Sequence, residues 1–179
     1  MAVQVKGAGQ VAWFAARTKY GQEIGIRNRL REMEGVEFFI PTRMRRNYRG
    51  KLKEHPVITN LVFIRTTRQR AFDLQNDEGL PVRYLFDYVR HVTLTVPDKQ
   101  MEDFMKVFEV NLSEGGLVDQ PLELGERVRI TKGPLKDVEG NVLELHGKIF
   151  VVVGLCGMVY AKARVPRAWL EKVNEDNIH

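Results

Sequence analysis

The sequence has a single cysteine, Cys156, among its 179 residues, so no disulfide can form within the chain. We therefore expect a reducing compartment, with Cys156 as a small buried hydrophobic residue rather than a nucleophile. No apolar run approaches the roughly 20 residues that span a bilayer. Residues 1–10 also lack the basic-then-apolar layout of a secretory signal. These absences predict a cytoplasmic protein with no membrane contact.

Patterns typical of catalysis and metal binding are also missing. The four histidines are scattered, and none has a metal-binding partner at i+3 or i+4. No Ser-His-Asp or Cys-His arrangement can be assembled. Gly7-Ala8-Gly9 lacks the preceding strand and following helix that a dinucleotide-binding loop requires. We expect no metal, no cofactor and no enzymatic activity.

The positive charge is unevenly distributed along the chain. Residues 1–111 hold 19 Lys/Arg against 13 Asp/Glu, a balance of +6, whereas residues 112–179 hold 9 against 10, a balance of −1. The two balances sum to the net charge of +5. A polyanionic partner is therefore expected to bind the first part of the chain.

The hydrophobic pattern predicts two modules. Strand patterns occur at 11–18, 36–40, 61–64, 82–86 and 93–96, and helix patterns at about 21–34, 69–76 and 98–110. This order predicts an α+β fold in residues 10–111, an α/β sandwich whose mainly antiparallel sheet is flanked by helices. Residues 112–122 contain Gly115-Gly116 and have no period, as is typical of a linker. The strand pattern of residues 123–174 predicts a small all-β domain in which His146-Gly147 forms the turn of a hairpin.

A basic hairpin is predicted between the second and third of these strands. Six cations fall within the eleven residues 43–53, and Gly50 marks the tip. Cations also protect exposed sheet edges, but six exceed that need. This density favours contact with a polyanion; the predicted residues are Arg43, Arg45, Arg46, Arg49, Lys51 and Lys53.

Several motifs, in this order, resemble those of the NusG family of transcription factors. They are Trp13-Phe14-Ala15-Ala16-Arg17-Thr18 with Glu23 after it, Phe38-Phe39-Ile40-Pro41-Thr42, Thr59-Asn60-Leu61-Val62-Phe63-Ile64 and Val96-Pro97-Asp98. Further on, residues 128–140 resemble the KOW motif, represented here by Lys132, Gly133, Pro134, Leu135 and Gly140. The resemblance implies an N-terminal NusG domain followed by a small KOW domain with an SH3-like β-barrel.

The resemblance also implies a partner and a mechanism. Family members bind RNA polymerase at the β′ clamp helices and disfavour paused states. The matching groove positions are Phe14, Phe39, Ile58, Leu61 and Phe63, of which Ile58 and Leu61 are the best candidates for exposed groove residues. Thr66 and Thr67 would lie toward the β gate loop of the polymerase. No cofactor is implied, and we expect a monomer.

Upstream or non-template DNA, or nascent RNA, is the second implied partner. Lys19, Arg27 and Arg31 would join the hairpin cations in contacting phosphates. The KOW module would bind a ribosomal protein or the Rho terminator, with Lys132, Pro134 and Leu135 as its exposed turn.

Two departures from the family pattern point to a specialised member. Thr59-Asn60-Leu61 stands where a Pro-Gly-Tyr run is usual, and Asp137 replaces a common glycine. The pattern is most similar to RfaH-like proteins and to UpxY-type regulators of capsular polysaccharide operons, which implies antitermination at operons of that type. The alternative is a ribosome-associated KOW protein that binds RNA. The near-neutral second module argues against that alternative.

Overall fold

The computed structural model describes residues 9–110, 117–118 and 124–173 and divides into two compact units, Met1–Pro97 and Asp98–His179. This division lies before the predicted boundary at residue 111, because the helix over residues 98–110 groups with the second unit. Among the described residues, no helix is both long enough and apolar enough to cross a membrane.

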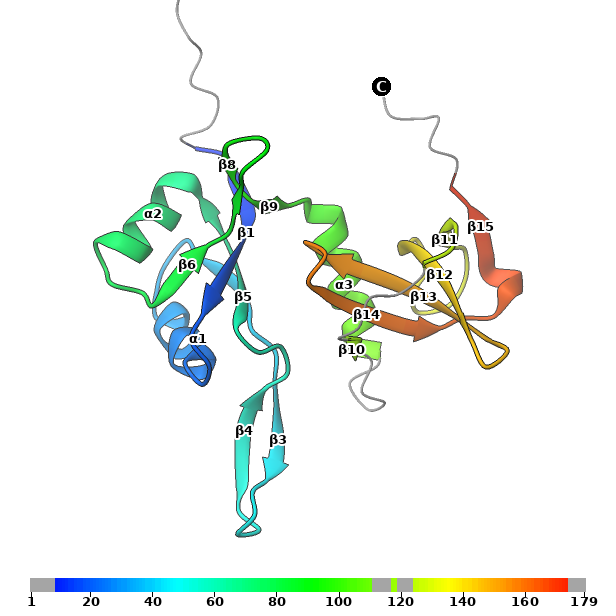
Figure 1. The fold of residues 1–179 in the computed structure, drawn as a ribbon, viewed down its shortest axis with the longest axis horizontal. Coiled ribbons are helices and arrows are strands. Elements are labelled where there is room, and N and C mark those ends of the chain that lie inside the picture. Colours follow the sequence, from blue (N-terminus) through cyan, green and yellow to red (C-terminus); the bar gives the residue numbers. More distant parts are fainter. Residues whose placement is uncertain (1–8, 111–116, 119–123, 174–179) are drawn as a thin grey trace, which may run out of the picture. The chain divides into compact units, whose positions relative to one another are not determined.

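The first unit is built on an antiparallel sheet (Figure 1). Its strands run in the order β2-β5-β1-β6, and β9 also pairs with β1. Their bounds are β1 Val11–Thr18, β2 Glu37–Phe39, β5 Leu61–Thr67, β6 Val82–Tyr84 and β9 Thr95–Val96. Strand β5 lies near the centre of the sheet, and its first four residues are all buried. Such a continuous apolar run is typical of a strand covered on both faces.

Helices α1 (Glu23–Arg31) and α2 (Arg68–Asn76) contribute to the core on one face of this sheet. Helix α2 begins with an N-cap in which the Thr67 side chain accepts a hydrogen bond from the amide of Arg70. The core joins residues of the sheet to Ile26 and Leu30 of α1 and Leu74 of α2. Ile26 and Leu30 are about one helical turn apart, so they lie on the same face of α1.

Two hairpins extend the first unit. Strands β3 (Thr42–Arg46) and β4 (Leu52–Pro56) pair only with each other and project away from the sheet (Figure 1). Strands β7 (Phe86–Asp87) and β8 (Val92–Thr93) form a second, shorter hairpin. The predicted basic hairpin is therefore confirmed as an element, and Gly50 lies in its turn with a φ of +74°.

The second unit consists of a six-stranded antiparallel sheet and helix α3 (Asp98–Val110). The strand order is β10-β14-β13-β12-β11-β15, and within the described residues this order does not close on itself, so the predicted barrel closure is not seen. The bounds are β10 Leu117–Val118, β11 Arg127–Ile130, β12 Glu139–Leu145, β13 Lys148–Leu155, β14 Val159–Arg164 and β15 Leu170–Lys172, with a short 3-10 helix, η1, at Arg167–Trp169. Strand β10 falls within the segment predicted as a linker, and most of that segment lies outside the described residues.

Helix α3 packs against β13 and β14 and is tied to the sheet by polar contacts. The buried carboxylate of Asp103 accepts a hydrogen bond from the amide of Glu139 at 3.0 Å. It also forms an ion pair with Lys99. Gln100 donates to the carbonyl of Gly154 at 2.6 Å. These contacts group the helix with the second unit, whereas the predicted domain bounds of 10–111 include it in the first.

Candidate functional site

The two faces of the first unit's sheet have different neighbours. Opposite residues on paired antiparallel strands share a face, and the register pairs Ala15 with Phe63 and Phe39 with Phe63. The other face carries Ala16, Val62 and Ile64, which belong to the core with α1 and α2. The face with Phe39 and Phe63 is therefore the one that α1 and α2 leave uncovered. We call it the helix-free face in the sense that α1 and α2 do not cover it; its apolar members are Trp13, Ala15, Phe39, Leu61, Phe63 and Val96, and Arg17, Glu37 and Arg65 lie on it as well.

The predicted groove residues do not all lie on this face. Phe39, Leu61 and Phe63 do, but Phe14 pairs with Ile64 on the opposite face and packs edge-on against Tyr84 at 5.9 Å. Phe14 is therefore a core residue, contrary to the prediction. Ile58 and Leu61, predicted to be exposed, are each only 6% exposed. Their burial corrects the expectation of an open groove.

The approach to strand β5 is held by a buried carboxylate. Glu23 in the first turn of α1 is fully buried, and its Oε1 accepts a hydrogen bond from the amide of Asn60 at 2.9 Å. Asn60 has a φ of +59°, in the left-handed region that asparagine tolerates better than most residues. This contact fixes the turn from which Leu61 enters the sheet.

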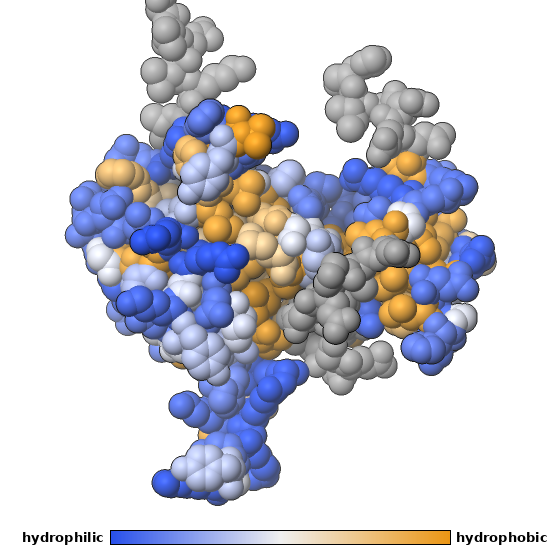
Figure 2. Space-filling view, in the orientation of Figure 1, coloured by the Kyte–Doolittle hydropathy of each residue, from blue (hydrophilic) through white to orange (hydrophobic). Residues whose placement is uncertain are grey.

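The β3–β4 hairpin has two chemically distinct faces, a feature that the linear sequence does not show. Register pairs Arg43 with His55 and Arg45 with Lys53, so four basic side chains share one face. The hairpin surface is largely hydrophilic in Figure 2. Like charges directly opposite each other destabilise a strand pair, and a bound anion would relieve that repulsion. All six predicted hairpin cations are exposed.

An ion pair between a buried arginine and a half-buried glutamate anchors the base of this hairpin to α1. Arg27 is 6% exposed and donates two hydrogen bonds to the carboxylate of Glu54 in β4, one of them 2.8 Å long. It also donates to Thr42 Oγ1 at 2.8 Å, and Thr42 in turn donates to Glu54. The sequence predicted Arg27 as a phosphate contact, and this is wrong because its guanidinium is already occupied inside the protein.

The same contacts set the electrostatics of the anchor. The hydrogen bond from Arg27, followed by that from Thr42, lowers the pKa of Glu54 to about 2. The positive charge of Arg31 adds to this effect, which places Arg31 within electrostatic reach of the hairpin base. Arg31 and Lys19 are exposed, as a phosphate contact requires.

Thr66 and Thr67, predicted to lie toward the β gate loop of the polymerase, make contacts within the first unit. Thr66 is 1% exposed and donates to the carbonyl of Gly35 at 3.3 Å. Thr67 caps α2. Neither contact points to a partner surface.

In the second unit, the predicted turn is only partly exposed. Lys132 and Pro134 are exposed, but Leu135 is 6% exposed and is therefore a core residue rather than a contact residue. A Cβ on Gly133 would lie 2.5 Å from the Trp169 ring, and its φ is +81°. Gly140 is equally confined, with Val152 O 2.5 Å from the Cβ position. Both glycines are required by close packing.

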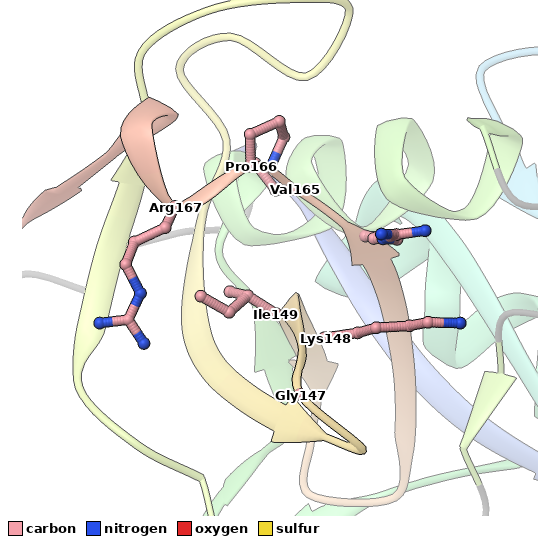
Figure 3. Close-up of a pocket in the computed structure, with 7 residues that line it drawn as sticks. Gly147, Lys148, Ile149, Val165, Pro166 and Arg167 are labelled. Atoms are coloured by element: carbon pink, nitrogen blue, oxygen red, sulfur yellow. The ribbon is translucent and has the colours of Figure 1, made fainter.

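A shallow pocket of about 460 Å³ lies between residues 147–149 and 164–167 (Figure 3). Figure 3 shows Lys148 and Arg167 pointing to opposite sides of it. Arg167 pairs with Glu144 at 3.5 Å. Because the two labelled cations diverge, they do not converge on one ligand atom.

The chain matches the model of a known protein family. A family model described as "Transcription termination factor nusG" matches residues 11–105, just over half of the chain. The chain belongs to the NusG family. A search of curated proteins finds no significant match. Membership in this family supports a role in transcription, since NusG-family factors generally bind RNA polymerase. The match includes the helix-free face and the basic hairpin of this NusG-family domain.

Proposed function

We propose that this NusG-family protein is an elongation and antitermination factor that binds the β′ clamp helices of RNA polymerase through the helix-free face. The observation that carries the proposal is the composition of that face. Trp13, Phe39, Leu61 and Phe63 present aromatic and aliphatic side chains that neither α1 nor α2 covers. An amphipathic helix pair is the kind of partner that such a face fits.

Binding through this face requires that it first be uncovered. Trp13 and Leu61 are each 6% exposed, and Phe63 is fully buried. A protein whose binding-competent conformer is a minor fraction binds with an affinity reduced by that fraction. The proposal therefore includes a conformational step before polymerase is engaged, and suppression of pausing then follows as a population shift of the polymerase.

The basic hairpin supplies the second contact of the proposal. Its cationic face would lie along the phosphates of upstream or non-template DNA, or of nascent RNA, adding affinity that falls with salt. We further propose that the second unit is a KOW module that tethers a ribosomal protein or Rho, and that the factor serves polysaccharide-type operons as a UpxY- or RfaH-like paralogue. None of these roles needs a catalytic group.

The test measures polymerase binding by the full chain with and without Phe39. Phe39 is the most suitable position because it lies on the helix-free face and is only partly buried, so Phe39→Ser disturbs the core less than a change at the fully buried Phe63 would. The matched control is Phe72→Ser, which removes an aromatic ring that is 59% exposed on α2. If Phe39 is a binding hot spot, Phe39→Ser weakens polymerase binding roughly 30-fold and the control stays within twofold.

A transcription assay completes the test. The wild type should shorten pauses, and Phe39→Ser should lose that effect at concentrations where Phe72→Ser keeps it. Failure of the wild-type chain to bind polymerase, or equal behaviour of the two variants, would contradict the proposal. Thermal melting of both variants shows whether either change acts through folding.

A further inference from the structure

The tip of the β3–β4 hairpin presents an aromatic ring that is almost fully exposed. Tyr48 is 88% exposed, and within the described residues its ring contact is with Arg49, whose guanidinium lies 5.1 Å from the ring centroid. Guanidinium groups commonly stack on aromatic faces in this way. The tip thus pairs a π-face with a cation, next to further cations on both strands.

The turn that carries Tyr48 is ordered by its own hydrogen bonds. The side chain of Asn47 accepts from the amides of Arg49 and Lys51, each at 3.0 Å. The amide of Asn47 donates to the carbonyl of Lys51 at 2.9 Å, and Gly50 takes the left-handed conformation that the turn needs. The ring is therefore held on a defined turn, so binding need not first order the backbone beneath it.

The hairpin is fixed at its other end as well. The ion pair of Arg27 and Glu54 ties its base to α1, so both ends of the arm are set before any ligand arrives. Tyr48 is not part of the first unit's core, so its fixed position does not serve packing there. A fixed position of this kind favours recognition of a partner. An exposed ring on a fixed arm gains free energy only when a partner covers it.

The surrounding charges identify that partner as nucleic acid rather than an acidic protein segment. Phosphates would meet Arg45, Lys53 and their neighbours, while Tyr48 offers a π-face that carboxylates do not use but that every nucleobase can stack on. Bases within a duplex already stack on each other, so only an unpaired base is free to stack on the tip.

We propose that Tyr48 stacks on an unpaired base, so that the hairpin binds single-stranded nucleic acid in preference to duplex of equal length. The inference rests on the nucleic-acid contact proposed above and adds a residue and a strand preference to it. DNA and RNA share the required chemistry. Tyr48 is then a specificity-determining residue, whereas the cations supply charge without discrimination.

The experiment uses the full chain and fluorescence anisotropy with three labelled probes of about ten nucleotides. The probes are oligo(dT), oligo(rU) and a duplex. Tyr48→Ser removes the ring and Tyr48→Phe keeps it. The control Tyr88→Ser removes a ring that is 81% exposed on the β7–β8 hairpin, outside the basic arm.

We expect Tyr48→Ser to weaken single-strand binding by roughly five- to 150-fold, the range that corresponds to loss of one base stack. Duplex binding should change less than twofold, and the salt dependence should not change because no charge is lost. Tyr48→Phe and Tyr88→Ser should bind like the wild type. A loss confined to the oligo(dT) or the oligo(rU) probe supports the proposal and identifies the strand as DNA or RNA.

The outcomes separate this inference from the function on which it rests. If the wild type binds the probes and Arg45→Gln/Lys53→Gln weakens binding, but Tyr48→Ser does not, the stacking role is overturned and the hairpin's charge contact stands. If the wild type binds no probe, both fail. Binding of a labelled polyglutamate peptide as tight as that of the oligonucleotides would point to an acidic protein instead and would also overturn the proposal.

Discussion

Replacing Arg27 should loosen the base of the basic hairpin without removing any cation from its exposed faces. Arg27 is 6% exposed, and it satisfies both the Glu54 carboxylate and the Thr42 hydroxyl. In Arg27→Met, the side chain keeps most of its apolar volume, but Glu54 loses its partner. The matched control is Arg31→Met, which removes an exposed cation one turn further along α1.

The size of the effect follows from how deeply each partner is buried. Removing one partner of a fully buried ion pair typically costs about 3–5 kcal/mol. The Glu54 side chain retains 35% exposure, so water partly replaces the lost contact. We therefore expect a loss of about 2–3 kcal/mol from the anchor. Arg31→Met should cost less than about 0.5 kcal/mol, as surface changes usually do.

Hydrogen exchange of peptides covering residues 42–56 measures this loss where it occurs. A global unfolding curve is less suitable, because a chain with two units need not unfold in one step. If the hairpin opens locally, about 2–3 kcal/mol corresponds to a roughly 30- to 150-fold increase in its exchange. Arg27→Met with Glu54→Met should recover much of the protection, since replacing both partners leaves no unpaired charge.

The pH dependence supplies a second check with a definite sign. The anchor lowers the pKa of Glu54 to about 2, below the value of roughly 4.3 expected in the unfolded chain. The stabilisation is therefore complete above about pH 4.5 and is lost as the pH falls toward 2. Wild type and Arg27→Met should converge over that interval. Equal hairpin exchange in Arg27→Met and Arg31→Met at pH 7 would refute the reasoning.

Two further predictions concern the second unit. Gly133→Ala should destabilise it by about 2 kcal/mol or more, because the new Cβ would lie 2.5 Å from Trp169 at a φ of +81°. Gly147 has a similar φ of +71° but open space around its Cβ position, so Gly147→Ala is the control. The difference between the melting temperatures of the two variants measures the clash with Trp169 alone, and equal melting temperatures would contradict the clash. Burial raises the pKa of Cys156 to about 11, so at pH 8 its alkylation by iodoacetamide should be roughly a hundred times slower than that of a free thiol. Mass spectrometry measures the alkylation rate of Cys156, with glutathione as the free-thiol reference. Comparable rates for the two thiols would contradict this prediction.

Local patterns in the sequence predict the elements well where a single physical requirement decides them. The strand predicted over residues 11–18 is confirmed as β1, and its register with β5 places Trp13 and Phe14 on opposite faces. The turn at His146-Gly147 is confirmed too, with both residues at positive φ. Each of these features depends only on neighbouring residues, and so it can be recognised without the rest of the fold.

The assignment of faces and roles could not be predicted, because it depends on tertiary partners. Both faces of β5 are apolar, so alternation alone does not show which face α1 and α2 cover. The family resemblance placed Phe14 in the predicted groove, and alternation alone could not correct this. Arg27 looked like a surface cation beside Arg31, because its partner Glu54 lies 27 residues further along the chain.

The hairpin shows why counting charges was sufficient to predict a basic element but not the arrangement of its cations. Six cations in eleven residues indicate a polyanion partner, but the count treats them as equivalent. The register separates them: Arg43, Arg45 and Lys53 share one face with His55, while Arg46 lies on the other face with Glu54. A fold under selection for stability alone would mix the signs across the strands, because Arg45 opposite Lys53 costs free energy in the free protein. The anchor at Arg27 holds this unfavourable arrangement in place, and binding of an anion would recover the cost. The proposed nucleic-acid contact therefore depends on both features together: the charge of the hairpin and the anchor that holds it in position.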